Sequence, residues 1–518
     1  MTKPFPYLVA AASAFLVSLS FPSFDLGIFA WFGLSPLLFV LRQQKSLVAA
    51  ATGYLFGVVF WVVPGFWIPK VLTFDNFLIV VFFFSLFYLV FGFIYRLICK
   101  RIGFWIILGA PALWVTLEYV RCNISFLSWP WNLVGHSQYR YLPIIQIADI
   151  TGVYGISFLI VMVNQLLSEV LDIFIERRGP SALSNPQTAK TKFVAHISAV
   201  VLALGVTLVY GWYKLSLPES ENRLRVALVQ ANVLTWDNMP VVDQEKHLQA
   251  YEGLTREVAV SRPDLIVWPS SSLPAPIRYS RLVNFNVRRL AIETKSYLLV
   301  GGAGMDKFGP SKDGFLPFSN TEFLIAPNGR IVAEYNKIRL LPFNEYLPLQ
   351  GIITWPEWIT SLKKSFVAGE EYTLFEVSGE KFGTPICWEN MFPDLFSRFV
   401  KEGAHFMVSV TNEGFFKQTA APYQSLAMNA FRAVENRVAV VRSAATGISA
   451  FINSNGEIVE RVQNSDGKDL FVSGILIRDI PVSKSKSFYT IYGDIFAYFA
   501  IIFAVLMIVV SLLRKRVP

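Results

Sequence analysis

The sequence has few cysteines and few histidines for its length. Only three cysteines and four histidines occur among its 518 residues. The cysteines, Cys99, Cys122 and Cys387, lie far apart, and two of them lie in or beside apolar segments, so neither a disulfide framework nor a Cys-x-x-Cys zinc site is expected. The histidines are isolated and lack the spacing of metal ligands. We therefore expect no metal and no other cofactor.

Charged residues are also scarce. They make up 16% of the chain, whereas apolar residues make up 53%, which is too hydrophobic for an ordinary soluble multidomain protein. The formal net charge of +9 could suggest a nucleic-acid partner. In the hydrophobic regions, however, the basic residues gather in short connecting loops and form no continuous stripe. Membrane orientation explains this pattern better, so we expect membrane lipid rather than nucleic acid as a partner.

Hydrophobic segments lie before and after one long polar region. A run of about twenty apolar residues can cross the roughly 30 Å of membrane hydrocarbon as a helix. We predict about eight spans, of which the first, second and fifth are short. The first resembles a signal peptide, but no clear cleavage site follows it, and we interpret it as a retained span. The eight segments are 4–21, 26–40, 47–68, 77–98, 104–120, 142–171, 193–212 and 488–513.

Basic residues in the loops predict the orientation of these spans. Most of them fall on alternate connections, whereas the opposite short loops carry only Lys70, Arg121 and Arg140. The positive-inside rule then places both termini in the cytoplasm and the long polar region outside, which is the periplasm in a bacterium with two membranes. The residues on the predicted cytoplasmic side are Lys3, Arg42, Lys45, Arg96, Lys100, Arg101, Arg177, Arg178, Lys190, Lys192, Arg514, Lys515 and Arg516.

The polar region changes to short β-rich blocks separated by amphipathic stretches. This alternation predicts an α/β layered domain with both sheet faces covered. We divide the chain into spans one to seven over 1–213, the α/β domain over 214–486, and a last span with a tail over 487–518. Strands are predicted at 224–230, 264–268, 297–301, 321–325, 381–386, 405–410, 438–443, 448–452 and 470–476. Helices are predicted at 242–260, 280–294, 393–401 and 422–436, and turns at Asn328-Gly329 and Asn455-Gly456.

One stretch of this domain has the pattern of a nucleophile. From Gly383 a short apolar strand leads to Cys387 and then to acidic and aromatic residues. A strand that ends in a sharp turn can hold a thiol where polar neighbours convert it to the reactive thiolate. The alternative is that Cys387 is a small buried hydrophobe. Two further strand ends favour the first interpretation: a buried-strand pattern ends at Trp268-Pro269, and another leads into Tyr335-Asn336-Lys337.

This ordered set resembles the nitrilase superfamily, in which a Glu, a Lys and a Cys reach the site from three strand ends. With hydrophobic segments on both sides, the whole chain resembles the apolipoprotein N-acyltransferase family of the bacterial inner membrane. The resemblance implies a polytopic α-helical membrane domain with an αββα nitrilase-like sandwich. It also implies that Cys387 is the acyl-accepting nucleophile and Lys337 the electrostatic stabiliser. The implied partners are a phospholipid donor and a diacylglyceryl-cysteine lipoprotein, whose N-terminal amine accepts the chain through a Cys387 thioester, and we expect a monomer.

The sequence departs from the family at the position of the general base. Ser270 stands where the family has Glu directly after Trp-Pro. A neutral hydroxyl cannot take a proton from a thiol as a carboxylate does, and loss of such a base costs about 10²–10⁴ in rate. Glu345, at the place of the family's second glutamate, is the best remaining carboxylate, and Glu389 is the next. Each has the alternative of a structural carboxylate that holds Lys337 or a backbone amide.

Two further departures lie in the same lobe, Ser425 where a histidine is usual and Ala430 where an arginine is usual. They leave open a paralogue that binds lipid or lipoprotein without turnover. A membrane-tethered amidase shares the thiol chemistry but would not need eight spans. On the substrate side we expect apolar or loop residues near the thiol, with core packing as the alternative for each. These candidates are Trp236, Trp388 and Phe415, and Glu389 is a further substrate-side candidate.

Overall fold

The protein divides into two compact units, Met1–Leu217 with Tyr492–Pro518, and Pro218–Ile491. The structure is a computed structural model. It describes residues 4–22, 24–71, 73–175, 186–235, 239–305, 318–356, 359–360, 362 and 365–514.

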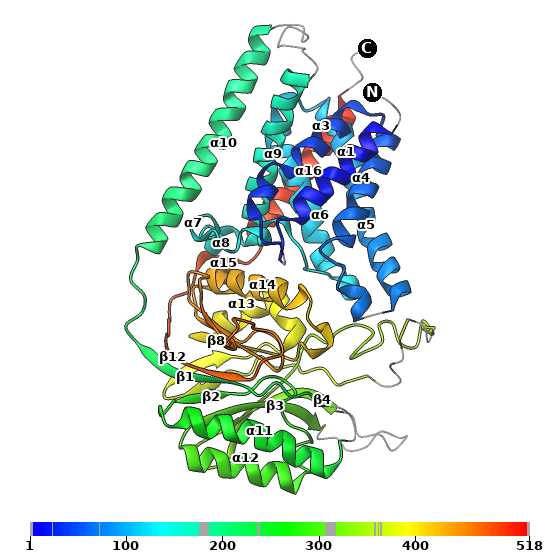
Figure 1. The fold of residues 1–518 in the computed structure, drawn as a ribbon. Helices are drawn as coiled ribbons and strands as arrows, with labels where there is room; N and C mark the ends of the chain where they lie inside the picture. The colour runs from blue at the N-terminus through cyan, green and yellow to red at the C-terminus, as the bar shows by residue number, and fades with distance from the viewer. Residues whose placement is uncertain are drawn as a thin grey trace. The chain divides into compact units, whose positions relative to one another are not determined.

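The first unit is helical (Figure 1). Five of its helices are long and apolar enough to cross a membrane within the described residues. The predicted count of about eight spans is not confirmed, because the other apolar helices are shorter. The long helices are α5 (Phe74–Cys99), α6 (Ile106–Asn123), α9 (Val153–Ile175), α10 (Pro186–Leu215) and α16 (Ile495–Leu513). The shorter apolar helices include α1 (Phe5–Ser18), α3 (Ser35–Gln43) and α4 (Ser46–Val62).

The single span predicted over 142–171 is wrong. The segment forms α7 (Leu142–Ile145), α8 (Ala148–Thr151) and only then α9. The break falls at Gly152, whose φ of 61° no right-handed helix contains. The turn buries Asp149, which accepts a hydrogen bond from Tyr210 at 2.8 Å and pairs with Lys214 at 3.0 Å. A carboxylate within an apolar run thus has protein partners, as its cost in lipid requires.

Glycines bring two of the helices into close contact. A side chain at Gly53 of α4 would lie 2.2 Å from the Tyr88 carbonyl oxygen of α5, and one at Gly92 of α5 would lie 2.4 Å from the Ala49 carbonyl oxygen. Small residues allow backbones to approach in this way, and apolar helices in lipid gain their association energy from such packing.

The second unit is an α/β sandwich of two six-stranded sheets, as expected. The first sheet has the order β12-β1-β2-β3-β4-β5 and the second β11-β10-β9-β8-β7-β6. The first comprises β1 (Arg223–Gln230), β2 (Leu265–Val267), β3 (Tyr297–Met305), β4 (Phe318–Ile325), β5 (Ile331–Asn336) and β12 (Gly474–Pro481). The second comprises β6 (Phe375–Val377), β7 (Glu380–Gly383), β8 (Phe406–Thr411), β9 (Val440–Ala444), β10 (Ala450–Ile452) and β11 (Ile458–Arg461).

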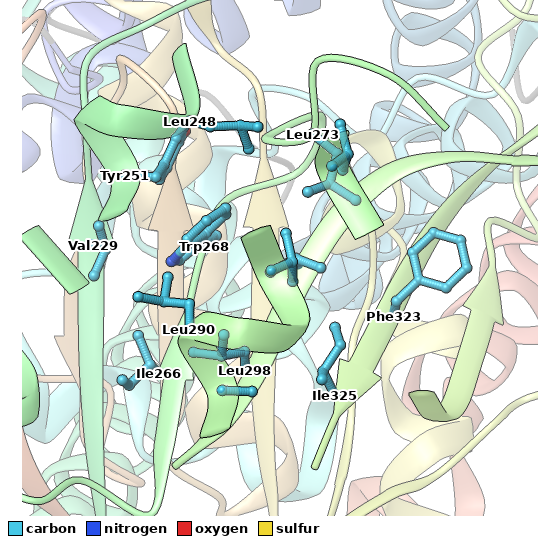
Figure 2. Close-up of a cluster of buried hydrophobic side chains, with 14 of the residues drawn as sticks. Val229, Leu248, Tyr251, Ile266, Trp268, Leu273, Leu290, Leu298, Phe323 and Ile325 are labelled. Carbon is cyan, nitrogen blue, oxygen red and sulfur yellow. The ribbon is translucent and has the colours of Figure 1, made fainter. Parts of the chain in front are cut away.

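Helices cover the outer faces of the sandwich (Figure 1). They are α11 (Val241–Ala259), α12 (Arg281–Thr294), α13 (Pro393–Glu402) and α14 (Ala421–Asn436). Between the first sheet and its helices lies a cluster of buried hydrophobic side chains (Figure 2). Within it the rings of Tyr251 on α11 and Trp268 after β2 stack with centroids 4.5 Å apart. Trp268 Nε1 also donates to Thr255 at 2.9 Å, which fixes the chain direction beyond β2.

The predicted elements of this unit agree with the structure in most places. All four helices occur, and the two turns occur with Gly329 at φ 77° and Gly456 at φ 81°. The strand predicted at 470–476 is wrong, since β12 begins at Gly474 and the preceding Phe471 has a positive φ of 55°. The strands β6 and β11 were not predicted, and β5 was predicted only as a strand end at Tyr335-Asn336-Lys337.

Candidate active site

Three strand ends supply the candidate residues. Lys337 directly follows β5 of the first sheet, and Ser270 comes shortly after β2 of the same sheet. Cys387 follows β7 of the second sheet and begins the 3₁₀ helix η7 (Cys387–Met391). The two sheets face each other in the sandwich, so residues that leave neighbouring strand ends can meet between them.

Cys387 lies at a strained turn. Its φ is 53°, a left-handed value that few non-glycine residues adopt and that costs about 1–3 kcal/mol. The turn begins at Ile386, which forms a parallel bridge with Val410 of β8. This backbone conformation reverses the chain immediately after the strand. Strain of this kind persists only where surrounding contacts impose it, and it is frequent at active sites.

Opposing influences act on the Cys387 thiol. Burial raises its pKa, the Lys337 ammonium lowers it, the Glu345 carboxylate raises it, and a hydrogen bond with the Thr411 side chain lowers it. The net result is a pKa above the ordinary value. Because the thiolate is the nucleophile, this thiol needs a proton acceptor to react at neutral pH.

Lys337 forms a buried ion pair with Glu345. Its Nζ donates to the two Glu345 oxygens at 2.7 and 2.8 Å, and the Leu341 backbone N–H donates to the same carboxylate at 2.7 Å. Burial opposes the Lys337 charge, but Glu345 and Cys387 together raise its pKa above the ordinary value. Lys337 is therefore a permanent cation. Of the two interpretations of Glu345, these contacts favour the carboxylate that holds Lys337.

Glu389 connects the turn at Ile386-Cys387 (the cysteine turn) to the segment Lys337–Arg339 (the lysine segment) through hydrogen bonds. Its carboxylate accepts from the backbone N–H groups of Ile338 at 2.8 Å, Arg339 at 2.9 Å and Ile386 at 2.8 Å, and from the Tyr335 hydroxyl at 2.9 Å. The side chain is fully buried. Burial raises its pKa, whereas the backbone donors lower it. The predicted contact with substrate is disfavoured, because these oxygens are used within the protein.

A second polar network is centred on Arg442 and includes a residue of η7, the helix that begins at Cys387. Arg442 of β9 pairs with Glu413 at 2.5 Å and donates to Asn429 of α14. Ser425, at one of the departures noted in the sequence, accepts from Arg442 at 3.1 Å and from Asn390 of η7 at 3.3 Å. The serine thus takes part in the network that supports the cysteine turn. Ala430 is a fully buried residue of α14.

Ser270 lies against β3 and β4. Its side chain is buried, and the adjoining residue, Ser271, has a positive φ of 57°. A Cβ atom placed on Gly301 of β3 would lie 2.7 Å from Ser270 Cα and 2.3 Å from Oε1 of Glu322 on β4. Ser270 and Glu322 therefore both lie next to the space that a side chain at residue 301 would occupy. The sequence pattern does not single out Glu322, which is one polar residue within an apolar strand.

The predicted aromatic residues are in three different situations. Trp388 is buried in η7, with its ring edge-on to Phe392 at a centroid distance of 5.3 Å, which agrees with the core alternative. Phe415 is 43% exposed and stays available for an apolar ligand. Trp236 lies outside the described residues. In the part of the chain that the structure describes, no group of three or more His, Cys, Asp or Glu is arranged to hold a metal ion.

Two family models match the chain. Residues 13–166 match the apolipoprotein N-acyltransferase N-terminal domain, and residues 225–489 match carbon-nitrogen hydrolase. An apolipoprotein N-acyltransferase from Geobacter metallireducens is 32% identical over 99% of this chain and 96% of its own length. One from Chlorobaculum tepidum is 27% identical over 99% of this chain and 97% of its own length.

Solved structures with a similar fold belong to the nitrilase superfamily. An amidase from Nesterenkonia AN1 aligns with 55% of this chain and 95% of its own, at 17% identity and a TM-score of 0.38. The yeast protein Nit3 from Saccharomyces cerevisiae aligns with 51% of this chain and 91% of its own, at 19% identity and a TM-score of 0.38.

Proposed function

The chain belongs to the apolipoprotein N-acyltransferase family, and we propose from this that it N-acylates lipoproteins through a thioester on Cys387. The observation that carries the proposal is the full-length likeness to such transferases, over both the helical unit and the α/β unit. It is supported by the strained turn that presents Cys387 beside a buried cation. The donor is a phospholipid and the acceptor a diacylglyceryl-cysteine lipoprotein.

The first half-reaction forms the acyl-enzyme. The Cys387 thiol loses its proton, and its sulfur attacks the carbonyl carbon of a phospholipid ester. A C–S bond forms and the ester C–O bond breaks, and the leaving alkoxide takes up a proton to become the lysophospholipid. Lys337 stabilises the negative charge that develops on the carbonyl oxygen, which is often the largest single catalytic contribution. Its ion pair with Glu345 keeps it charged and in place.

The second half-reaction transfers the chain. The N-terminal amine of the lipoprotein attacks the thioester carbon, a C–N bond forms, and the C–S bond breaks. The amine loses one proton, and the departing sulfur regains one. Transfer rather than hydrolysis requires that water be kept from the thioester.

The protein is a multi-pass membrane protein, and five helices among the described residues are long and apolar enough to span. We propose that both termini are cytoplasmic and that the α/β domain, residues 214–486, lies in the periplasm of the inner membrane. The support is the excess of Lys and Arg on alternate loops.

A defined acceptor tests the function. The purified protein is mixed in detergent with a phospholipid labelled in its acyl chains and a synthetic diacylglyceryl-cysteine peptide. We expect label in the peptide with the parent and none with Cys387→Ala. A peptide whose N-terminal amine is acetylated is the matched control and should stay unlabelled. Label in free fatty acid alone would overturn the transferase and indicate a hydrolase.

A further inference from the structure

Glu322 is an unusual carboxylate within this fold. It lies in the middle of β4 and is fully buried, and among the described residues neither of its oxygens has a hydrogen-bond partner. Burying a carboxyl group without a partner is expensive, since an unsatisfied polar group costs about 1–3 kcal/mol and more if it is charged. A sequence that keeps such a group inside a strand accepts this loss of stability. Groups of this kind are candidates for function rather than folding.

Strand alternation shows which way Glu322 points. Its neighbour Phe323 belongs to the cluster beneath α11 and α12, together with its cross-strand partner Val300 (Figure 2). Successive side chains of a strand point to opposite faces, so Glu322 and its partner Gly301 lie on the other face. That face of the first sheet is the one turned towards the second sheet, from which Cys387 comes.

On this face Glu322 meets the loop that follows β2. Its Oε1 lies 2.3 Å, and Ser270 Cα 2.7 Å, from the position of a Cβ atom on Gly301. Because Gly301 has no side chain, the Glu322 carboxylate and the Ser270 backbone can both occupy the space beside it. The carboxylate therefore lies beside the very residue that, by resemblance to the family, stands where the general-base glutamate is expected.

Each of the other carboxylates near the thiol has at least one oxygen in a hydrogen bond or ion pair. Both oxygens of Glu345 bind Lys337, and Glu389 accepts three backbone N–H groups and the Tyr335 hydroxyl. Glu413 pairs with Arg442 through Oε1. Glu322 differs from all three, because both of its oxygens lack a partner among the described residues.

We propose that Glu322 is the proton acceptor for Cys387, with the Ser270 hydroxyl as the bridge between the two. The proposal rests on the proposed function. In the first half-reaction Ser270 Oγ receives the thiol proton and passes its own proton to Glu322. The thiolate then forms the C–S bond, the ester C–O bond breaks, and the proton returns along the same path to the leaving alkoxide. In the second half-reaction the path takes a proton from the attacking amine and returns it to the Cys387 sulfur.

The surroundings of Glu322 fix the expected pH dependence. Burial raises the pKa of its carboxyl well above the ordinary value. On its own face of the sheet, the neighbouring titratable group is Tyr335, the cross-strand partner of Glu322 on β5. Tyr251 of α11, whose pKa both burial and Glu322 raise, lies on the opposite face within the buried cluster. A general base works best when its pKa lies near the operating pH. The rate of acyl-enzyme formation should therefore rise with pH as Glu322 gives up its proton.

The experiment is a pH–rate profile of acyl-enzyme formation, followed by intact-mass analysis after mixing the full-length protein with a palmitoyl phospholipid in detergent. We expect Glu322→Gln to form the adduct about 10²–10⁴ times more slowly than the parent. The double variant Ser270→Glu with Glu322→Gln returns a carboxylate to the same place from β2, so it should regain most of the rate. Glu252→Gln, the same substitution at a buried glutamate of α11, is the control and should keep the parent rate.

Three results would overturn the inference. A Glu322→Gln variant with the parent rate would exclude Glu322 as the proton acceptor. A slow Glu322→Gln variant that keeps the parent's pH profile would indicate a structural role, and so would the absence of rescue by Ser270→Glu in folded protein. In each of these cases the parent still forms the adduct and the proposed function stands. A parent that forms no adduct would instead overturn the proposed function, and the inference with it.

Discussion

At the residue scale, the ion pair of Lys337 and Glu345 fixes a cation beside the thiol at a cost in desolvation. Breaking such a pair leaves an uncompensated charge inside the protein, which costs about 3–5 kcal/mol. We therefore expect Glu345→Ala to lower the thermal unfolding temperature in detergent markedly and to slow acyl-enzyme formation. Differential scanning fluorimetry on both proteins measures the first effect.

The matched control for this prediction removes both charges. Lys337→Met with Glu345→Leu replaces the pair by apolar groups, which is often neutral for stability. That variant should unfold near the parent temperature yet form no acyl-enzyme. An unfolding temperature of Glu345→Ala equal to that of the parent would show that the pair is not needed to hold Lys337.

A pH-dependent stability difference follows from Glu322. Burial raises its pKa in the folded state, so between the unfolded value near 4.5 and the folded value the folded protein holds a proton that the unfolded chain releases. In that window the free energy of unfolding falls as pH rises. Glu322→Gln removes this loss, so its unfolding temperature minus that of the parent should grow as pH rises from 4.5.

Unfolding temperatures of the two proteins across a pH series in one detergent provide the check. The same series with Glu252→Gln corrects for general effects of removing an acidic residue. A difference that stays constant or shrinks with rising pH would contradict a raised pKa at Glu322.

The sequence predicts some of these residues and not others. Cys387 and Lys337 follow strand ends, and the order of the chain is enough to bring such residues to one edge. Glu322 is different, because its proposed role depends on its proximity to Gly301 and Ser270. These residues become neighbours only when β2, β3 and β4 pair in the sheet. The sequence predicts that both faces of the sheet are covered, but the pattern of a single strand does not show which residues of other strands lie beside Glu322.

At the element scale, Glu389 joins the turn after β7 to the segment after β5. One carboxylate accepts the N–H groups of Ile386, Ile338 and Arg339. In Glu389→Gln the amide nitrogen cannot accept, so at least one buried donor loses its partner at a cost of about 1–3 kcal/mol. We expect lower stability and slower acyl-enzyme formation, because the cysteine turn loses its link to the lysine segment.

Urea unfolding of the variant, with acyl-enzyme rates measured in parallel, tests this link. Glu376→Gln on β6, where the side chain is exposed, is the control and should change neither quantity. A Glu389→Gln variant as stable and as fast as the parent would mean that the turn keeps its conformation without the carboxylate.

Elements were predictable where their hydrophobic pattern was strong. The fully buried strands β2 and β8 have apolar sequences, and the helices α12 and α13 each bury one apolar face. The strands β5 and β11 have mixed burial, which gives no periodic signal. The strand predicted at 470–476 failed because Phe471 takes a left-handed conformation and donates its N–H to the Thr446 carbonyl oxygen outside any sheet.

At the scale of the whole molecule, the loop charges predict on which side of the membrane the termini and the α/β domain lie. Alkaline phosphatase, which is active only outside the cytoplasm, should be active when inserted in the exposed turn at Asp466-Gly467. The same enzyme fused after Pro518 should be inactive, and a fluorescent protein at that position should fluoresce. The reverse pattern of activities would contradict the orientation assigned from Lys and Arg.

The number of spans is hard to predict from the sequence. Segments 4–21 and 47–68 are apolar, yet the structure gives the shorter helices α1 and α4 there. Apolar length in a sequence does not show where a helix ends, because turns such as the one at Gly152 interrupt apolar runs. The charge pattern is less affected, since it depends on loops rather than on helix ends.

The central claim is that Cys387 carries the acyl chain between two substrates. Its most direct test is intact-mass analysis of the full-length protein after incubation with a palmitoyl phospholipid in detergent, in the absence of a lipoprotein acceptor. We predict one palmitoyl adduct that maps to the peptide containing Cys387, is released by neutral hydroxylamine as a thioester, and is absent from Cys387→Ala. It should also disappear from the parent when a diacylglyceryl-cysteine peptide is added. An adduct that persists in Cys387→Ala, or a folded parent that gains none, would contradict the account.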